Sequence, residues 1–502
     1  MNNSKRIAKN TILMYFRMLT LLIIGFLISR ILLQKLGITD FGIYSLVGSI
    51  IAMFSSMRTL FVQATQRFLN FEMGKENMER LKIVFNTSII VNLIVSLLFA
   101  ISVELLGMWF IYNEINVPAD RLYATKVTLH LSVATSIIYI MTTPLDALLI
   151  AHERISAYAY LTIIDHILKL LILFLLYLTT DRLIFYAFLL FAVSILMRIT
   201  YEIYCRKNFS ECRYDFIWDK ELLTKMTSFA GWQFLGSTAY TLTHNGLNML
   251  LNSFGGTVVN AARGVAYQAF AAVNQLVNNM ELVLSPYSVK LFAQDERDKM
   301  LSLFAFSSKI MFLITNCVVL PILFFTEEII ELWLGTIPDY SVGFIRLLML
   351  YSIIRSLHTS VDMLFRAVGK MKKYQITESI LLAMPLVLSY IALKFGFSLY
   401  VVFIFIIIIE VVNLIMILNL AKFDAQLKLK SYYVSVIIPV VISVTISFGL
   451  LKYVGDSFGG RLFALITAEV ISLVIIYLIS FSFKERQAIN KLFISKFLKD
   501  HD

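Results

Sequence analysis

Charge is scarce in this sequence: Asp, Glu, Lys and Arg make up 15% of its 502 residues, whereas a soluble domain has about a quarter. Its 7 prolines and 20 glycines are too few for a collagen-like or low-complexity disordered chain. Three cysteines and six scattered histidines match no disulfide framework, zinc motif or redox motif. The sequence also lacks a Walker A loop and a Gly-x-Ser-x-Gly elbow. We therefore expect no metal, no cofactor and no catalytic residue.

Apolar residues are correspondingly abundant, at 59% of the chain, with a mean hydropathy of +0.79. One core cannot hold this excess, because cores stop growing near about 250–300 residues. A membrane-spanning helix needs about 20 mostly apolar residues. Fourteen such stretches occur, at about 11–33, 41–63, 84–111, 122–150, 156–178, 182–204, 222–252, 258–285, 301–326, 340–366, 374–396, 399–421, 431–452 and 460–482. The sequence therefore predicts an all-α polytopic membrane protein.

The distribution of basic residues predicts the orientation. With a cytoplasmic N-terminus, 28 of the 44 lysines and arginines fall in cytoplasmic segments and 7 in external ones. Such an excess marks the cytoplasmic side, so we expect both termini there. The net charge of +11 is then explained by anionic lipid head groups, without nucleic-acid binding.

Two short segments resemble each other and suggest an internal repeat. Residues 36–42 join the first two spans and residues 254–260 join the seventh and eighth; each is followed by a span that carries an arginine, Arg58 or Arg263. We expect an N-lobe of six spans at 1–220, a C-lobe of six spans at 221–425, and two extra spans with a tail at 426–502. Two similar bundles with the substrate between them are a known transporter plan.

Basic residues inside spans are costly unless they are paired, face water or reach an interface. Spacing of i,i+4 places side chains next to each other on a helix. Three pairs are expected to form in this way: Asp165 with Lys169, Arg198 with Glu202, and Asp362 with Arg366. Arg30 and Arg346 lie near span ends, where they can extend to the interface.

Arg17, Arg58 and Arg263 have no acidic residue three or four positions away. Either they pair with carboxylates on other helices, or Arg17 reaches the interface, or they face a water-filled cationic cavity, which we favour. The planar guanidinium binds phosphate in a bidentate manner. We therefore expect these three arginines to bind an anionic substrate.

The seventh and eighth spans each carry a polar stripe at helical spacing. We expect these side chains to line the cavity, with hydrogen bonding between helices as the alternative: Gln233, His244, Asn248, Asn260, Tyr267 and Asn274. His244 is expected to be a hydrogen-bonded polar residue rather than a proton switch. Asp146 and Glu281 are the predicted carboxylates for proton or sodium coupling, or else partners of basic residues on other helices.

The start of the chain is similar to bacterial polysaccharide repeat-unit flippases of the Wzx type. The residues that carry this resemblance are Lys9, Asn10, Thr11, Tyr15, Arg17, Ser29, Arg30, Leu36, Gly37, Asp40, Phe41, Gly42, Tyr44, Val47 and Gly48. Gly231-Trp232 and the 260–264 segment resemble the counterpart in the second lobe. These flippases belong to the multidrug/oligosaccharidyl-lipid/polysaccharide (MOP) exporter superfamily.

The resemblance implies two six-helix lobes that alternate access across a bacterial inner membrane. It implies transfer of undecaprenyl-diphosphate-linked oligosaccharide to the outer leaflet for O-antigen, capsule or exopolysaccharide synthesis. The implied partners are membrane lipids and a glycan polymerase and glycosyltransferases of the same pathway. Related lipid II flippases have cavity arginines on helices 1, 2 and 8, which Arg17, Arg58 and Arg263 resemble in placement. The last two spans would bind the lipid tail or merely pack.

Two other functions stay open. The first is a cation-coupled multidrug exporter of the same superfamily; such exporters usually have twelve spans and an acidic first-lobe cavity. The second is a membrane-embedded glycan polymerase or acyltransferase, against which the short external loops and the lack of a catalytic constellation count.

Overall fold

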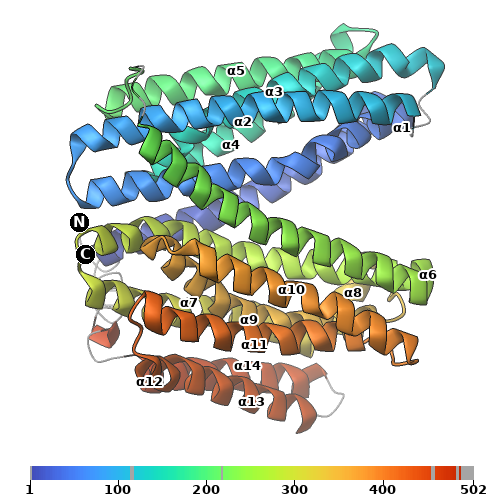
Figure 1. Cartoon of the computed structure of the whole chain (residues 1–502). Coiled ribbons are helices and arrows are strands. Elements are labelled where there is room, and N and C mark those ends of the chain that lie inside the picture. The colour runs from blue at the N-terminus through green and yellow to red at the C-terminus, as the bar shows by residue number, and fades with distance from the viewer. Residues whose placement is uncertain are drawn as a thin grey trace, which may run out of the picture. The chain divides into compact units, whose positions relative to one another are not determined.

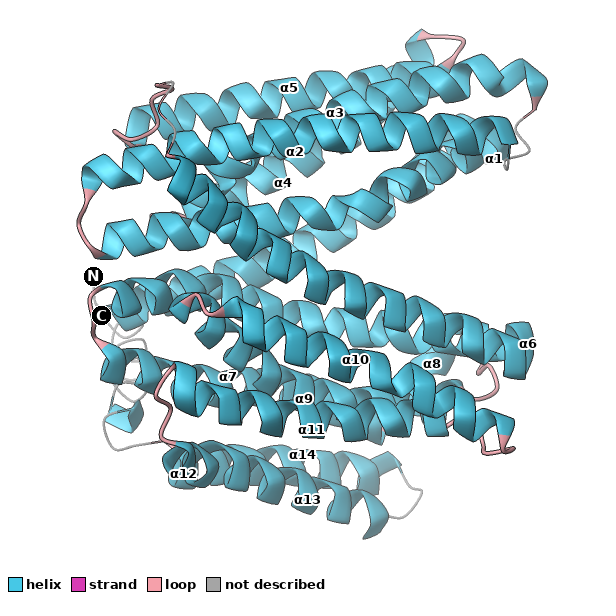
Figure 2. Ribbon diagram, in the orientation of Figure 1, coloured by secondary structure: helices cyan, strands magenta, loops and turns pink. Residues whose placement is uncertain are grey.

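The computed structural model describes residues 3–113, 118–215, 217, 219–453, 458–481 and 485–487, and at 3–8, 49–50, 52–59 and a few single positions it describes the backbone alone. This described part consists of helices and short connections, without a strand (Figure 2). The chain divides by packing between Gly231 and Trp232. We call the compact unit Lys9–Gly231 the N-lobe, and the unit that begins at Trp232 the C-lobe. The predicted three-part division at 220 and 425 stays a prediction.

Each lobe begins with a helical hairpin that turns at a glycine. Helix α1 (Asn3–Gly74) is interrupted at Gly37, where φ is 79°, and helix α6 (Lys220–Ala293) is interrupted at Gly256, where φ is 74°. Residues with a Cβ rarely adopt such angles, whereas glycine does so readily. Figure 1 shows that the chain reverses direction at both points. The predicted tight turns at 36–42 and 254–260 are therefore confirmed.

The N-lobe continues with α2 (Met78–Asn113), the short η1 (Ala119–Arg121), α3 (Leu122–Ala151), α4 (Ile155–Leu171) with its 3-10 extension η2 (Ile172–Leu178), and α5 (Arg182–Asn208). Helix α3 packs against both α2 and α5. Aliphatic and aromatic side chains such as Val95, Phe99 and Val133 fill the space between these helices. Lipid-facing positions of the same helices are also apolar, as the composition requires.

A charged cluster joins the connections at one end of the N-lobe. The Arg121 guanidinium forms ion pairs with Asp40, just after the Gly37 turn, and with Asp181, the N-cap residue of α5, at 3.2 Å. Arg182 donates to the Lys35 carbonyl oxygen at 2.8 Å. These bonds hold the α1 turn against the starts of α3 and α5.

The C-lobe contains α6 from Trp232 onward, then α7 (Arg297–Phe324), α8 (Thr326–Leu334), α9 (Ser341–Val368), α10 (Met371–Lys394) and α11 (Val401–Asp424). Helix α9 packs along α7 and α11, and α10 packs along α11. Two further helices, α13 and α14, pack on each other and on α7. Helix α13 (Ile438–Tyr453) is preceded by α12 (Leu429–Tyr432) and the π-helical η3 (Tyr433–Ile437). Helix α14 (Phe458–Ile475) is followed by the π-helical η4 (Ile476–Ser480). The hydroxyls of Ser443 in α13 and Ser472 in α14 are hydrogen-bonded at 2.7 Å.

Ten helices in the described residues are long and apolar enough to cross a membrane. The other four predicted spans, at 41–63, 222–252, 258–285 and 340–366, coincide with helix in α1, α6 and α9 but fall outside that set of ten. These four contain Arg58, Arg263, Arg355 or the polar stripes. The all-α membrane fold is confirmed, whereas the total of fourteen spans stays a prediction.

Candidate functional site

A buried arginine on α6 has only neutral partners among the described residues. The Arg263 side chain, whose residue is 8% exposed, donates from Nη1 to Asn248 Oδ1 at 3.0 Å and from Nη2 to the His244 carbonyl oxygen at 2.7 Å. Its guanidinium carbon lies 4.1 Å from the centroid of the Tyr267 ring. Because none of these groups is an anion, the positive charge of Arg263 is stabilised but not neutralised.

The Arg263 site unites three of the predicted lining residues and leaves the others apart. The His244 ring lies between Tyr240 and Tyr267, with ring centroids 4.1 and 5.2 Å away. Asn260 and Asn274 are half-buried on the same helix. Gln233 is buried on the first part of α6, where Gly236 leaves room for the side chain of Gln375 of α10.

The N-lobe offers a second membrane arginine with neutral contacts. The Arg17 guanidinium carbon lies 4.9 Å from the centroid of the Tyr158 ring, and Nη1 lies 3.7 Å from Met14 Sδ. Its Nε is buried without a hydrogen-bond partner among the described residues. The Arg58 side chain lies outside the described residues. The structure therefore gives Arg17 and Arg263 neutral direct contacts within their own lobes, and the charge of Arg17 also acts on His166, which lies beside Asp165.

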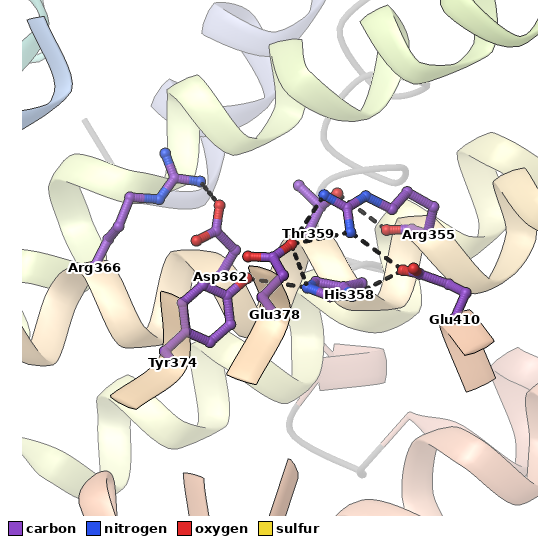
Figure 3. A network of polar contacts seen from close by, with 8 residues as sticks. All are labelled: Arg355, His358, Thr359, Asp362, Arg366, Tyr374, Glu378 and Glu410. Atoms are coloured by element: carbon purple, nitrogen blue, oxygen red, sulfur yellow. Dashed lines mark hydrogen bonds and ion pairs between the residues drawn. The ribbon is translucent and has the colours of Figure 1, made fainter. Parts of the chain in front are cut away.

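A different kind of cluster lies in the C-lobe at Arg355 of α9 (Figure 3). Arg355 Nη1 lies 3.4 Å from Glu378 Oε1 of α10 and 3.2 Å from Glu410 Oε1 of α11. His358, one turn along α9, contacts both glutamates, with Nε2 3.3 Å from Glu378 Oε1 and Nδ1 2.8 Å from Glu410 Oε1. His358 Nε2 also lies 3.0 Å from the Tyr374 hydroxyl. We call Arg355, His358, Glu378 and Glu410 the histidine cluster.

A second ion cluster continues toward the C-terminal end of α9. The Arg366 guanidinium pairs with Asp362 at 2.6 Å and with Glu281 of α6. The predicted pair of Asp362 with Arg366 is therefore confirmed. Glu281 therefore pairs with a basic residue on another helix, and its part in ion coupling stays a prediction.

The Arg263 site and the histidine cluster are linked by aromatic side chains. The Tyr267 ring lies 5.9 Å from Phe270, and Phe270 lies 5.3 Å from Tyr351 of α9, centroid to centroid. Tyr351 is one helical turn from Arg355, and His244 lies within electrostatic range of Arg355 and Glu410. Charged groups of both sites therefore act on His244.

The other predictions about charged residues inside the spans are partly confirmed. Lys169 pairs with Asp165 at 2.7 Å, as predicted. Glu202 lies 3.9 Å from Arg198 and closer, at 2.7 Å, to Arg206. Asp146 is buried on α3 and interacts electrostatically with Cys205 of α5.

The two arginines placed near span ends are both accessible at the surface. Arg346 is half exposed and pairs with Glu327 at 3.4 Å. Arg30 is exposed on α1. Neither contributes to the buried clusters described above.

A polar contact outside the spans joins the segment that follows α5 to the end of α3. Glu211 pairs with His152, which follows α3, and Phe209 stacks on the His152 ring. Burial raises the pKa of the Glu211 carboxyl, but hydrogen bonds from His152, a backbone amide and Ser210 outweigh this effect and leave that pKa below its ordinary value. The carboxylate form of Glu211 is therefore the stable one.

The histidine cluster is the part of the site that the sequence analysis missed. Arg355 lies inside the predicted span 340–366, but Glu378 and Glu410 are 23 and 55 residues away from it along the chain. A signal was present: each glutamate is a single carboxylate inside a strongly apolar stretch. An ionisable residue inside a span is a functional candidate by default, and pairing these carboxylates with Arg355 would have found the cluster.

Comparison with known proteins places the chain in a family. The model of the family described as "Polysaccharide biosynthesis protein" matches residues 7–292, which is more than half of the chain. A search of curated proteins gave no match. The family match includes α1 and α6, and therefore both arginines with neutral partners.

Solved structures share the fold at low sequence identity. A multidrug and toxic-compound-type (MATE) transporter in its straight conformation is 14% identical, with a TM-score of 0.72 over 84% of this chain and 96% of its own. An outward-facing multidrug resistance MATE transporter of the MOP superfamily is also 14% identical, with a TM-score of 0.73 and the same coverage. A MOP superfamily transporter from Pyrococcus furiosus, described as having a binding pocket of reversed polarity, is 15% identical with a TM-score of 0.71, again over 84% and 96%. The chain belongs to the polysaccharide biosynthesis protein family and has the fold of MOP-superfamily membrane transporters.

Proposed function

We propose that this transporter moves undecaprenyl-diphosphate-linked oligosaccharide from the cytoplasmic to the outer leaflet of a bacterial inner membrane. The observation that carries the proposal is the Arg263 site, a buried guanidinium whose partners are all neutral. A diphosphate supplies the missing negative charge and accepts bidentate hydrogen bonds. Arg17, with its neutral contacts in the N-lobe, provides a second cation for the same kind of ligand.

A multidrug exporter that carries cations is the competing function. Such a transporter needs an unneutralised carboxylate where the drug binds, whereas Glu378 and Glu410 each face Arg355 and His358. One structural relative is described as having a pocket of reversed polarity that suggests a different function. The shared fold therefore leaves the charge of the cargo open, and the residues of the site must decide it.

The test is alanine and lysine substitution of Arg263, with surface polysaccharide and membrane abundance measured together in the same cells. We expect Arg263→Ala to reduce export per molecule of transporter in the membrane at least about tenfold, which corresponds to about 1.4 kcal/mol. Arg263→Lys should restore export only in part, because lysine keeps the charge but loses the planar fork. Arg17→Ala should act in the same direction.

Arg346→Ala is the matched control, because Arg346 is a half-exposed arginine that pairs with Glu327. It should leave export unchanged. Normal export by both Arg263→Ala and Arg17→Ala would contradict the proposal, as would a loss that merely follows protein abundance. Export of lipophilic cations that survives in Arg263→Ala cells and fails on neutralising Glu378 would favour the multidrug alternative.

We also propose that both tails and the 205–225 loop face the cytoplasm, on the strength of the asymmetry in basic residues. The native cysteines of that segment cannot test this, because Cys205 and Cys212 are buried and burial raises the pKa of the Cys212 thiol to about 11. A cysteine-free chain with Ser210→Cys, at an exposed position, should resist an impermeant thiol reagent in intact cells. The same chain with Asp339→Cys, exposed before α9, should react. The opposite labelling pattern would overturn the orientation.

A further inference from the structure

The histidine cluster has an odd charge balance. Its one guanidinium, on Arg355, faces the two carboxylates of Glu378 and Glu410, and all four side chains of the cluster are largely buried. Buried charge is tolerated only when it is balanced and hydrogen-bonded. One more positive charge is needed, and the group in position to carry it is His358.

The contacts of the His358 imidazole also indicate that the cluster needs one more positive charge. Both ring nitrogens of His358 lie within ion-pairing distance of a carboxylate oxygen, Nδ1 at 2.8 Å from Glu410 and Nε2 at 3.3 Å from Glu378, and the hydrogen bond of Nε2 is with the Tyr374 hydroxyl. A neutral imidazole has a single N–H, so one of its nitrogens would turn a lone pair toward a carboxylate. An imidazolium, or a neutral imidazole beside one protonated glutamate, removes that repulsion. In either form the cluster holds one proton beyond those of a neutral His358 and two carboxylates.

The same geometry disfavours a sodium ion. Glu378 Oε1 and Glu410 Oε1 each already face both Arg355 and His358. A hard cation such as sodium prefers a shell of oxygen ligands, and here the space between the two glutamates holds a guanidinium and an imidazole. A proton needs no such shell.

Titratable groups extend from His358 along α9. Tyr374 of α10 contacts His358 and lies within electrostatic range of Asp362 and Arg366, and Arg366 pairs with Glu281 of α6. On the other side lie Tyr240 of α6 and Tyr351 of α9. Helix α7 also packs on α9, and its one charged residue beyond the first turn, Lys309, is 3.1 Å from Glu485. The polar series therefore runs from the middle of α9 to its C-terminal end at Val368.

We propose that the histidine cluster is a proton-binding site and that its proton is released and rebound in each transport cycle. Release breaks one N–H bond of the His358 imidazolium, leaves the electron pair on the ring, and passes the proton toward Asp362 and Glu281. The charge of the cluster changes from zero to minus one. The aromatic side chains of Tyr351, Phe270 and Tyr267 connect the histidine cluster to Arg263. When the charge of the cluster becomes more negative, Arg263 binds an anion less tightly. The second half of the proposal rests on the proposed function; the proton site itself does not.

The proton site is tested without any substrate, by nitrogen-15 NMR of the purified full chain labelled at its six histidines. The resonances that disappear in His358→Gln belong to His358. At pH 7 we expect them to be those of an imidazolium, and we expect Glu378→Gln with Glu410→Gln to convert them to those of a neutral ring. A neutral His358 at pH 7 with both glutamates ionised in the infrared spectrum would overturn the proposal. Sodium-dependent shifts of these resonances at constant pH would overturn it as well.

The exchange of the proton is tested with His358→Lys, because lysine supplies a permanent positive charge in place of the titratable one. We expect this variant to reach the membrane at wild-type abundance and to lose export at least tenfold. A cation needed only for folding would be replaced by lysine, so wild-type export by His358→Lys would overturn the proposal. His130→Gln, which removes an exposed histidine paired with Glu104 at 2.8 Å, is the matched control and should export normally.

The two proposals fail in different ways. If both Arg263→Ala and Arg17→Ala export normally while His358 is an imidazolium and His358→Lys blocks export, the anion site is wrong and the proton site stands. If His358 is neutral and both glutamates are ionised while Arg263→Ala blocks export, the proton site is wrong and the anion site stands.

Discussion

Arg263 and Arg355 are two largely buried arginines of one lobe, and their partners differ in charge. Arg263 is held by an amide oxygen, a backbone carbonyl and an aromatic ring, whereas Arg355 lies between two carboxylates and a histidine. The first arrangement keeps a net positive charge and suits an anionic ligand. The second has no net charge when the cluster is protonated, and it suits the binding of a proton. The partners of a membrane arginine, more than its depth, therefore indicate what it does.

The largest expected effect is that of Arg355→Ala on stability. It leaves Glu378 and Glu410 without their guanidinium, and breaking a buried ion pair by removing one partner costs about 3–5 kcal/mol. Thermal unfolding of the detergent-purified chain should show a strongly destabilised C-lobe. The variant Arg355→Met with Glu410→Gln removes opposite charges together and should recover most of the loss. Equal stability of Arg355→Ala and wild type would remove the contrast between the two arginines.

Arg263→Ala should destabilise the chain less. Its removal leaves Asn248 and the His244 carbonyl without a donor, which costs about 1–3 kcal/mol, but it leaves no anion unpaired. The same unfolding measurement should therefore separate the two variants, with Arg263→Ala nearer to wild type. A cost as large as that of Arg355→Ala would indicate that Arg263 has an acidic partner.

The ring beneath Arg263 should have a smaller effect, of about 0.5–2 kcal/mol, the range of cation–π contacts. Tyr267→Leu removes the ring that lies 4.1 Å from the guanidinium and should weaken export several-fold. Tyr267→Phe keeps the ring and should export nearly as wild type. The two variants are compared at matched abundance in the membrane. An equal fall in export would show that the Tyr267 hydroxyl, and not the ring, supports export.

The smallest effect concerns His152 and Glu211. This histidine–glutamate pair lies outside the spans, whereas the histidine cluster lies inside them. Because the pKa of Glu211 is lowered in the folded state, its contribution is present above its unfolded pKa, about 4.3, and is lost as pH falls through the folded pKa. Glu211→Gln should lower the melting temperature at pH 7 by an amount equivalent to about 0.5–1.5 kcal/mol, the net contribution of one hydrogen bond. The two chains should converge in acid. A difference that grows as pH falls would contradict the assigned direction.

Sequence patterns predicted local features of this molecule better than distant ones. Glycine at 37 and 256 marked both hairpin turns, and i,i+4 spacing found the pairs of Lys169 and Arg366, because both depend on neighbours within a few residues. Glu378 and Glu410 meet Arg355 only after three helices pack, and no local spacing encodes that. Glu281 was ranked for ion coupling for the same reason, since its partner Arg366 is 85 residues away.

The cluster at Arg121 has a consequence for how the chain is made. Asp40, Arg121 and Asp181 come from three successive connections on one side of the N-lobe, and 60 residues separate Arg121 from Asp181. During synthesis, Arg121 can neutralise Asp40 as soon as α3 begins to insert, whereas Asp181 becomes available only after α4 has crossed. The N-lobe is therefore closed at this end in two steps, and α5 completes a lobe whose first turn is already fixed. Membrane insertion in chain order thus assembles the lobe from its hairpin outward.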